Sequence, residues 1–192
     1  MARSYIKSKR ADNQAETRDR IVEAAVALHG EIGPAATTVS MIAERAGVQR
    51  HTVYSHFADE MSLLMACSGR HAELHPLPSP DLWAAVTDPA LRLTAGLGAL
   101  YTWYIANEAM TRNVLRDAET NEALREVSAL RFGTPLHAIY DSLAIGLGAK
   151  GKAALTLALS FYSWQTLVRD AGMKLKDAVA MMVHAIVSAD RK

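Results

Sequence analysis

The chain has 192 residues, of which 50% are hydrophobic and 21% are charged, and these proportions exclude a disordered chain as the default. Its net charge of +1 does not identify a partner, because a nucleic-acid binder needs a local basic face rather than a basic total. A single cysteine excludes an intramolecular disulfide, and the absence of a long uncharged apolar run argues against a leader or a membrane span, so we expect a cytoplasmic protein with no membrane partner.

The composition and the first apolar repeats both favour helices. Ala, Leu, Val, Ile and Met dominate the apolar residues, while Gly and Pro number only 11 and 6, so we predict an all-α fold. Apolar residues at three-to-four spacing predict a helix over 15–32, which a Gly-Pro pair ends. The threonines at 37–38 offer an N-cap for a short helix over 39–46, and Gly47 ends that helix.

A third short helix is predicted after Gly47, with Val48, Val53 and Phe57 turned inward. Its outward positions are polar: Gln49, Arg50, His51, Thr52 and Ser55. Asp59 is the expected N-cap of a fourth helix that runs toward Leu74.

Three prolines within 75–80 remove backbone donors and restrict their neighbours, so the predicted domain boundary lies there. It separates an N-terminal domain over 1–75 from a C-terminal domain over 76–192. The predicted segments of the second domain are 89–110, 111–118, 122–146 with a kink near Pro135, 152–170 and 174–188.

Two short helices joined through a glycine turn match what reading of the DNA major groove requires. The groove admits one helix, and Arg or Gln near its start can make paired hydrogen bonds to guanine or adenine. Thr38, Thr52, Tyr54 and His56 are the types that hold phosphate oxygens. A plain helical corner has the same spacing and remains the alternative at this point.

Three strings in this region resemble the DNA-binding domain of the TetR (tetracycline-repressor) family. They are Thr37-Thr38-Val39, Ile42-Ala43-Glu44-Arg45-Ala46-Gly47-Val48 and Thr52-Val53-Tyr54-Ser55-His56-Phe57. The resemblance extends back to Arg18 and forward to Leu64, about the first third of the chain, and is looser beyond it.

The resemblance implies an N-terminal three-helix helix-turn-helix head and a C-terminal helical ligand-binding and dimerisation domain. It implies a homodimer on a near-palindromic double-stranded DNA operator and a small-molecule effector, with a sequence-specific repressor released by that effector as the expected function. The matching positions imply DNA contacts by Thr38, Arg50, His51, Thr52, Tyr54 and His56, with Gln49 a further candidate at the helix start.

Two positions depart from the family pattern. Glu60 stands where the family often has a lysine, and His51 replaces a residue that is frequently small, so His51 either contacts DNA or packs on the next turn. Affinity for DNA is then expected to depend on Arg50 and on the basic N-terminal end. Residues 1–20 contain six basic and three acidic residues. A solvated terminus is the alternative for that end.

Two sets of residues are candidates in the second domain. The candidate lining of an effector pocket is aromatic or polar: Trp103, Tyr104, Phe132, His137, Tyr140 and Tyr162. Ordinary core packing is the alternative for each of them. The candidate dimer interface lies on the last two helices, which are apolar on more than one face: Ala154, Leu157, Ala158, Phe161, Trp164, Met181, Met182 and Ala185. A monomer with a thick core is the alternative.

Other chemistry is not expected. His71 and His75 share a helical face, but no third ligand is evident, and a histidine near a helix C-terminus is favoured by the helix dipole. No phosphate-binding glycine loop, nucleophile elbow or zinc-protease pattern occurs, so we expect neither an enzyme nor a cofactor. A non-specific architectural DNA-binding protein is the alternative function.

Overall fold

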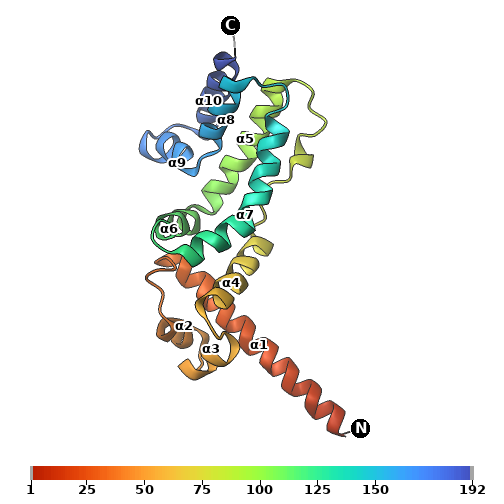
Figure 1. The fold of residues 1–192 in the computed structure, drawn as a ribbon, viewed down its shortest axis with the longest axis vertical. Helices are drawn as coiled ribbons and strands as arrows, with labels where there is room; N and C mark the ends of the chain where they lie inside the picture. The colour runs from red at the N-terminus through yellow and green to blue at the C-terminus, as the bar shows by residue number, and fades with distance from the viewer. Residues whose placement is uncertain (1, 191–192) are drawn as a thin grey trace. The chain divides into compact units, whose positions relative to one another are not determined.

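The computed structural model describes the backbone of residues 2–190 and the side chains of residues 12–190, and all its regular structure is helical, as predicted (Figure 1). The basic side chains at positions 3–10 lie outside that range. Within residues 2–190, none of the helices combines the length and the apolar composition needed to cross a bilayer. The elements are α1 (Ala2–Glu31), α2 (Val39–Ala46), α3 (Arg50–His56), α4 (Glu60–Leu74), η1 (Pro80–Leu82), α5 (Pro89–Ala106), α6 (Glu108–Ala118), α7 (Glu122–Leu143), α8 (Ala149–Leu159), α9 (Phe161–Trp164), η2 (Gln165–Asp170) and α10 (Leu175–Ala189).

The chain forms two compact units. The first contains the residues up to His75 together with Ala109–Arg131, and the second contains Pro76–Glu108 together with the residues from Phe132 onward. The chain leaves the first unit at the proline-rich stretch where the boundary was predicted. It also returns to that unit for 109–131, which a single boundary does not describe. The start of α7 contributes the buried Leu124 and Val127 to the core of the first unit, and the partly buried Val114 and Ala118 of α6 pack against that core.

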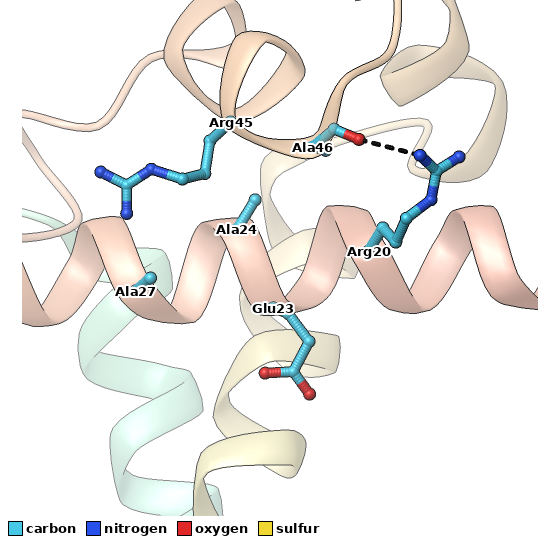
Figure 2. A pocket seen from close by; sticks show the side chains of 6 residues that line it. All are labelled: Arg20, Glu23, Ala24, Ala27, Arg45 and Ala46. Carbon is cyan, nitrogen blue, oxygen red and sulfur yellow. Dashed lines mark hydrogen bonds between the residues drawn. The ribbon is translucent and has the colours of Figure 1, made fainter.

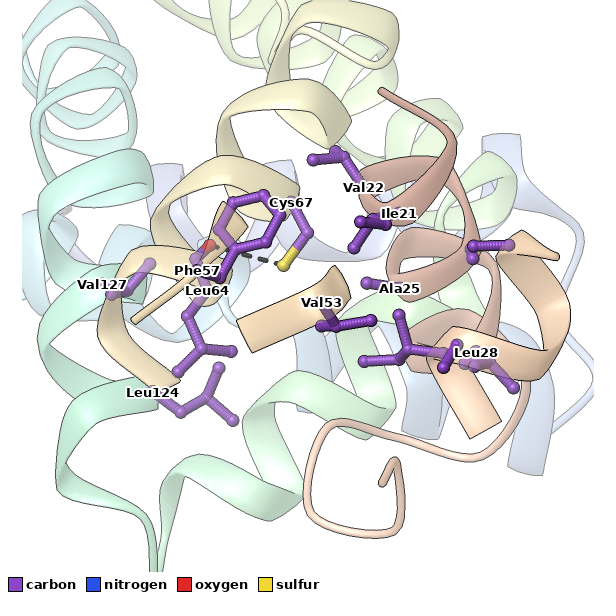
Figure 3. Packing of buried hydrophobic residues seen from close by; sticks show 14 residues of the cluster. Ile21, Val22, Ala25, Leu28, Val53, Phe57, Leu64, Cys67, Leu124 and Val127 are labelled. Atoms are coloured by element: carbon purple, nitrogen blue, oxygen red, sulfur yellow. Dashed lines mark hydrogen bonds between the residues drawn. The ribbon is translucent and has the colours of Figure 1, made fainter. Parts of the chain in front are cut away.

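The core of the first unit draws one apolar face from each of several helices, and Figure 3 shows these side chains converging. Its central members are Ile21, Ala25 and Leu28 of α1, Val53 and Phe57 at α3, Leu64 and Cys67 of α4, and Leu124 and Val127 of α7. A large apolar side chain buried in this way contributes about 1.5–3 kcal/mol relative to leaving it exposed. The core therefore holds two helices that are too short to be stable in isolation.

The ends of those short helices carry the predicted caps. The Thr38 hydroxyl accepts a hydrogen bond from the Met41 amide at 3.3 Å, and Gly47 ends α2 with a φ of 65°, a left-handed conformation that favours glycine. The Asp59 carboxylate accepts from the Ser62 amide at 2.7 Å, and the Ser62 hydroxyl completes a capping box. These local predictions are confirmed.

Polar contacts from α6 hold the connection between α1 and α2. The Asn113 amide donates to the carbonyls of His29 and Gly30 at 3.1 and 2.9 Å, near the C-terminus of α1. The carboxylate of Asp117 accepts from the Ala35 amide at 2.9 Å. Because both side chains are buried, each contact satisfies a polar group that would otherwise be costly to bury, and the loop leading into α2 is held in place.

The second unit packs α10 against both α8 and α5. Its fully buried side chains include Leu93, Leu97, Leu100, Ile139, Leu143, Leu155 and Ile186. The single helix predicted over 152–170 is wrong, because Ser160 is extended and separates α8 from α9. The buried hydroxyls of Tyr101 and Tyr104 donate to the carbonyls of Ala158 and Leu159 at 2.9 and 2.7 Å, which replaces the helical hydrogen bonds lost at this break.

Candidate DNA-binding surface

The helix α3 has one buried side and one polar side. Val53 and Phe57 anchor it with exposed fractions of 1% and 4%. Gln49, Arg50, His51 and Tyr54 are exposed, whereas Thr52 and His56 are half-buried. The structure thus places the predicted contacts at 49–56 on one short, anchored helix and its N-cap. Exposed polar side chains held by a buried anchor can reach base edges and phosphates without unfolding the helix.

Thr38 is exposed at the N-terminus of α2. Its oxygen already accepts the Met41 amide, but the hydroxyl proton remains a donor that a phosphate oxygen can accept. Thr38 can therefore cap α2 and contact the DNA backbone at the same time.

The structure accounts for the acid at position 60. The Glu60 carboxylate accepts a hydrogen bond from the Asn121 amide at 2.9 Å, and the Asn121 carbonyl oxygen accepts from the Leu124 amide at the start of α7, also at 2.9 Å. Glu60 therefore joins α4 to α7 within the first unit. This long-range contact has no signal in the local sequence pattern.

A recess of about 290 Å³ lies between α1 and α2. Its lining is Arg20, Glu23, Ala24, Ala27, Arg45 and Ala46 (Figure 2). The Arg45 guanidinium is bound to the Glu31 carboxylate at 2.7 and 2.8 Å, and Glu23 accepts from Arg70 at 2.5 Å. Figure 2 shows the Arg20 and Arg45 guanidinium groups extending in opposite directions, so they do not converge on one ligand in the recess.

The candidate pocket residues of the second unit do not share one environment. Tyr104 is buried in the core, and its burial raises the pKa of its hydroxyl. Trp103 and Phe132 are half-buried, with ring centroids 6.4 Å apart. The His137 ring stacks on the half-buried Tyr140 at 6.2 Å, and 74% of the His137 side chain is exposed. Tyr162 is also exposed.

An aromatic cluster around the α8–α9 break was not anticipated as a group. Tyr104 lies 5.4 Å from Phe161 and 5.7 Å from Trp164 between ring centroids. The indole N–H of Trp164 is buried without a hydrogen-bond partner among the described residues. The Arg169 guanidinium lies 5.4 Å from the Trp164 ring and pairs with Glu108 at 2.7 Å. No local pattern marks this cluster, because its members come from elements far apart in the sequence.

The candidate dimer residues fall into two groups. Ala158, Phe161 and Trp164 are buried inside the second unit, where they contribute to its own core. Ala154 and Met182 are half-buried. Leu157, Met181 and Ala185 are exposed, and the exposed fractions of Leu157 and Met181 are 60% and 47%. Among the candidate residues, the exposed Leu157, Met181 and Ala185 and the half-buried Ala154 and Met182 are therefore the ones that a second copy of the chain could contact.

His71 is buried near the C-terminus of α4, and its ring centroid lies 4.8 Å from that of His75. The Nε2 atom of His71 has no hydrogen-bond partner within the described part of the chain. No group of three potential metal ligands occurs among the described residues.

Residues 21–67 match the N-terminal segment of the family described as bacterial regulatory proteins, tetR family. The chain is 37% identical over 86 residues to the HTH-type transcriptional regulator SrpR of Pseudomonas putida, a match that covers 41% of this chain and 39% of that protein. It is 32% identical over 105 residues to the HTH-type transcriptional repressor KstR of Mycolicibacterium smegmatis, and this match covers 55% of this chain and 48% of that protein. The chain thus spans less than half the length of these two curated relatives.

Solved structures share the fold over nearly the whole chain. A TetR family transcription regulator from Marinobacter aquaeolei superposes with a TM-score of 0.63 at 17% identity, covering 94% of this chain and 100% of that one. The multidrug binding protein EbrR, complexed with imidazole, superposes with a TM-score of 0.58 at 21% identity, and this match covers 88% of this chain and 93% of that one. Residues 21–67 are thus similar to the TetR family of bacterial regulatory proteins, and the solved structures show the same fold over nearly the whole chain.

Proposed function

We propose that this chain is a sequence-specific DNA-binding transcriptional regulator that reads a double-stranded operator with α3. The observation that carries the proposal is the division of α3 into a buried side at Val53 and Phe57 and an exposed side that begins with Arg50 and His51. A helix anchored in this way presents its first turn to base edges in the major groove.

Within this proposal, Gln49 and Arg50 read bases, because their positions at the helix start suit paired hydrogen bonds to a base edge. His51 contacts a base or a neighbouring phosphate. Thr38, Thr52, Tyr54 and His56 hold backbone phosphates and set the register of the helix.

The expected mode of action is repression by a homodimer. KstR is described as a repressor, and two symmetric heads require an operator with near-palindromic half-sites about one helical turn apart. The exposed Leu157 and Met181 support a dimer interface on α8 and α10. EbrR is described as a multidrug binding protein, and the half-buried pair Trp103 and Phe132 supports an apolar effector here. Such an effector would release DNA by favouring the conformation with lower operator affinity.

Selection of bound duplexes from a random DNA pool, followed by titration of the enriched sequence at two salt concentrations, tests the proposal. Enrichment of a palindrome, bound roughly a thousandfold more tightly than unrelated DNA, is the expected result. Salt-sensitive binding without enrichment would instead indicate a non-specific architectural protein.

Arg50→Ala should weaken binding to the selected operator by roughly 5- to 150-fold for each head of the homodimer, equivalent to about 1–3 kcal/mol per contact, and relax the preference at one base position of each half-site. The control is Arg125→Ala, which removes an exposed arginine from α7 of the same unit. Fluorescence anisotropy measures both affinities, and thermal melting shows that both variants are folded. An unchanged operator affinity for Arg50→Ala would contradict the assignment of α3.

A further inference from the structure

Two arginines of α1 lie against opposite ends of the segment that contains α3. The guanidinium carbon of Arg18 is 4.9 Å from the ring centroid of Phe57, the residue directly after α3. The Arg20 guanidinium donates to the carbonyl of Ala46 at 3.2 Å, directly before the Gly47 turn (Figure 2). One guanidinium is therefore held where the chain approaches α3, and the other where it leaves.

Both groups keep their charge exposed. Arg18 and Arg20 are exposed, and no carboxylate pairs with either among the residues that the structure describes. By contrast, Arg45, Arg70 and Arg116 each bind a carboxylate within the same unit. The first unit thus neutralises these three arginines internally and leaves the two beside α3 available to an external anion.

The internal contacts of Arg18 and Arg20 orient them without using all their donors. The guanidinium carbon of Arg18 lies over the Phe57 ring, and a cation–π contact uses no hydrogen-bond acceptor, so N–H groups of Arg18 remain available to donate. Arg20 uses one donor on Ala46 and another on the Thr17 hydroxyl at 3.4 Å, out of the five N–H donors of a guanidinium. A preoriented arginine loses less side-chain freedom when it binds a phosphate.

We propose that Arg18 and Arg20 bind two separate backbone phosphates on either side of the major groove that α3 enters. This inference rests on the proposed function of α3. Residues two apart on a helix leave it in different directions, so the pair cannot share one phosphate but can straddle a groove. Because neither side chain lies on α3, these contacts add affinity without reading sequence. They supply positive charge to a head whose position 60 is an acid.

The test compares Arg18→Gln, Arg20→Gln and the double variant with the wild-type chain. Arg45→Gln is the matched control, because it removes the same charge from an arginine that already pairs with Glu31. Each protein is titrated by anisotropy against the selected operator and against a scrambled duplex, between about 50 and 200 mM salt.

Because a homodimer carries each substitution in both heads, each single α1 variant should reduce the slope of log K against log salt by about 1.8, which is about 0.9 per phosphate contact, and the double variant by about twice that amount. Binding to the operator and to the scrambled duplex should weaken by the same factor, about tenfold at 0.1 M salt for each phosphate lost. The ratio of the two affinities should therefore stay unchanged. Arg45→Gln should retain the wild-type slope.

Arg20→Lys separates phosphate binding from a purely structural role. A lysine keeps the charge but loses the planar fork that reaches Ala46. If Arg20 binds phosphate, Arg20→Lys should restore most of the salt slope that Arg20→Gln loses. If Arg20 only caps α2, both variants should melt at a lower temperature with the wild-type slope, which would overturn the proposal.

An unchanged salt slope in the folded Arg18→Gln and double variants would also overturn the proposal of phosphate binding. A change in the ratio of operator affinity to scrambled-duplex affinity would overturn it as well. Failure of the wild-type chain to select any sequence would overturn the proposed function instead. The slope comparison on the scrambled duplex then still decides whether these arginines bind phosphate.

Discussion

At the scale of single residues, two buried histidines are neutral in the folded chain near pH 7. The Nδ1 atom of His29 lies 3.5 Å from the Cys67 sulfur, and burial lowers the pKa of His29 to about 4, although Asp117 opposes the shift. Burial, together with the neighbouring His75, also lowers the pKa of His71 to about 4. Burial raises the pKa of the Cys67 thiol to about 12, so that thiol stays protonated and unreactive.

These shifts predict that stability falls as the pH drops from about 6.5 toward 4. The unfolded chain takes up protons on these histidines near pH 6.5, whereas the folded chain does so only near pH 4. Their full contribution is therefore present above pH 6.5, and each histidine should cost on the order of 2 kcal/mol of stability by pH 5. Urea unfolding between pH 7.5 and 5 measures this loss.

His71→Leu should make this pH dependence shallower, and it also removes the Nε2 atom that is buried without a partner. The control is His184→Leu, because His184 is exposed on α10. Equal pH dependence in the wild-type chain and in His71→Leu would show that His71 is not held neutral by burial.

At the scale of helices, the start of α8 depends on a side chain from the end of α10. The Asp190 carboxylate accepts hydrogen bonds from the amides of Gly148 and Gly151 at 2.7 and 2.8 Å. The N-cap position of α8 is Gly148, which has no side chain to cap the helix itself. Asp190 therefore supplies the cap from a distant part of the chain, and its negative charge also suits the positive end of the helix dipole.

Asp190→Ala should lower the free energy of unfolding by about 1–2 kcal/mol, because it leaves two amide donors at the first turn of α8 without their acceptor. The melting temperature should fall by about 2–8 °C. Asp190→Asn keeps one carbonyl oxygen as an acceptor, so its free energy of unfolding should fall by less than that of Asp190→Ala. Equal melting temperatures for all three proteins would show that water replaces the carboxylate at no cost.

At the scale of the whole molecule, the second unit leaves apolar side chains exposed on the helices that pack its core. Leu157 of α8 and Met181 of α10 are both largely exposed, and α8 and α10 pack against each other. Exposed apolar residues on two helices that pack against each other are typical of a surface that a second copy of the chain covers.

Leu157→Glu combined with Met181→Glu should convert a homodimer to a monomer, because charged residues are poorly tolerated at the centre of an interface. Loss of the second head should weaken operator binding by at least roughly a hundredfold. Sedimentation equilibrium measures the mass. The control is Leu91→Glu, which places the same charge at an exposed leucine of α5. A dimeric double variant with wild-type affinity would place the interface elsewhere.

The sequence by itself determined the helix-turn-helix. The Thr38 and Asp59 caps, the Gly47 turn and the inward Val53 were all predictable. Each depends on backbone conformation, capping or apolar spacing within a few residues, which a local pattern records.

Tertiary structure decided what depends on residues far apart in the chain. Asn113 and Asp117 bind the end of α1 and the following loop across more than 80 residues, and this places 109–131 in the first unit. The Tyr101 and Tyr104 hydroxyls bind the carbonyls at the break between α8 and α9, where neither glycine nor proline marks a helix end. Whether an aromatic side chain fills the core or stays exposed likewise depends on which distant helix packs against it, and periodicity within one helix does not contain that information.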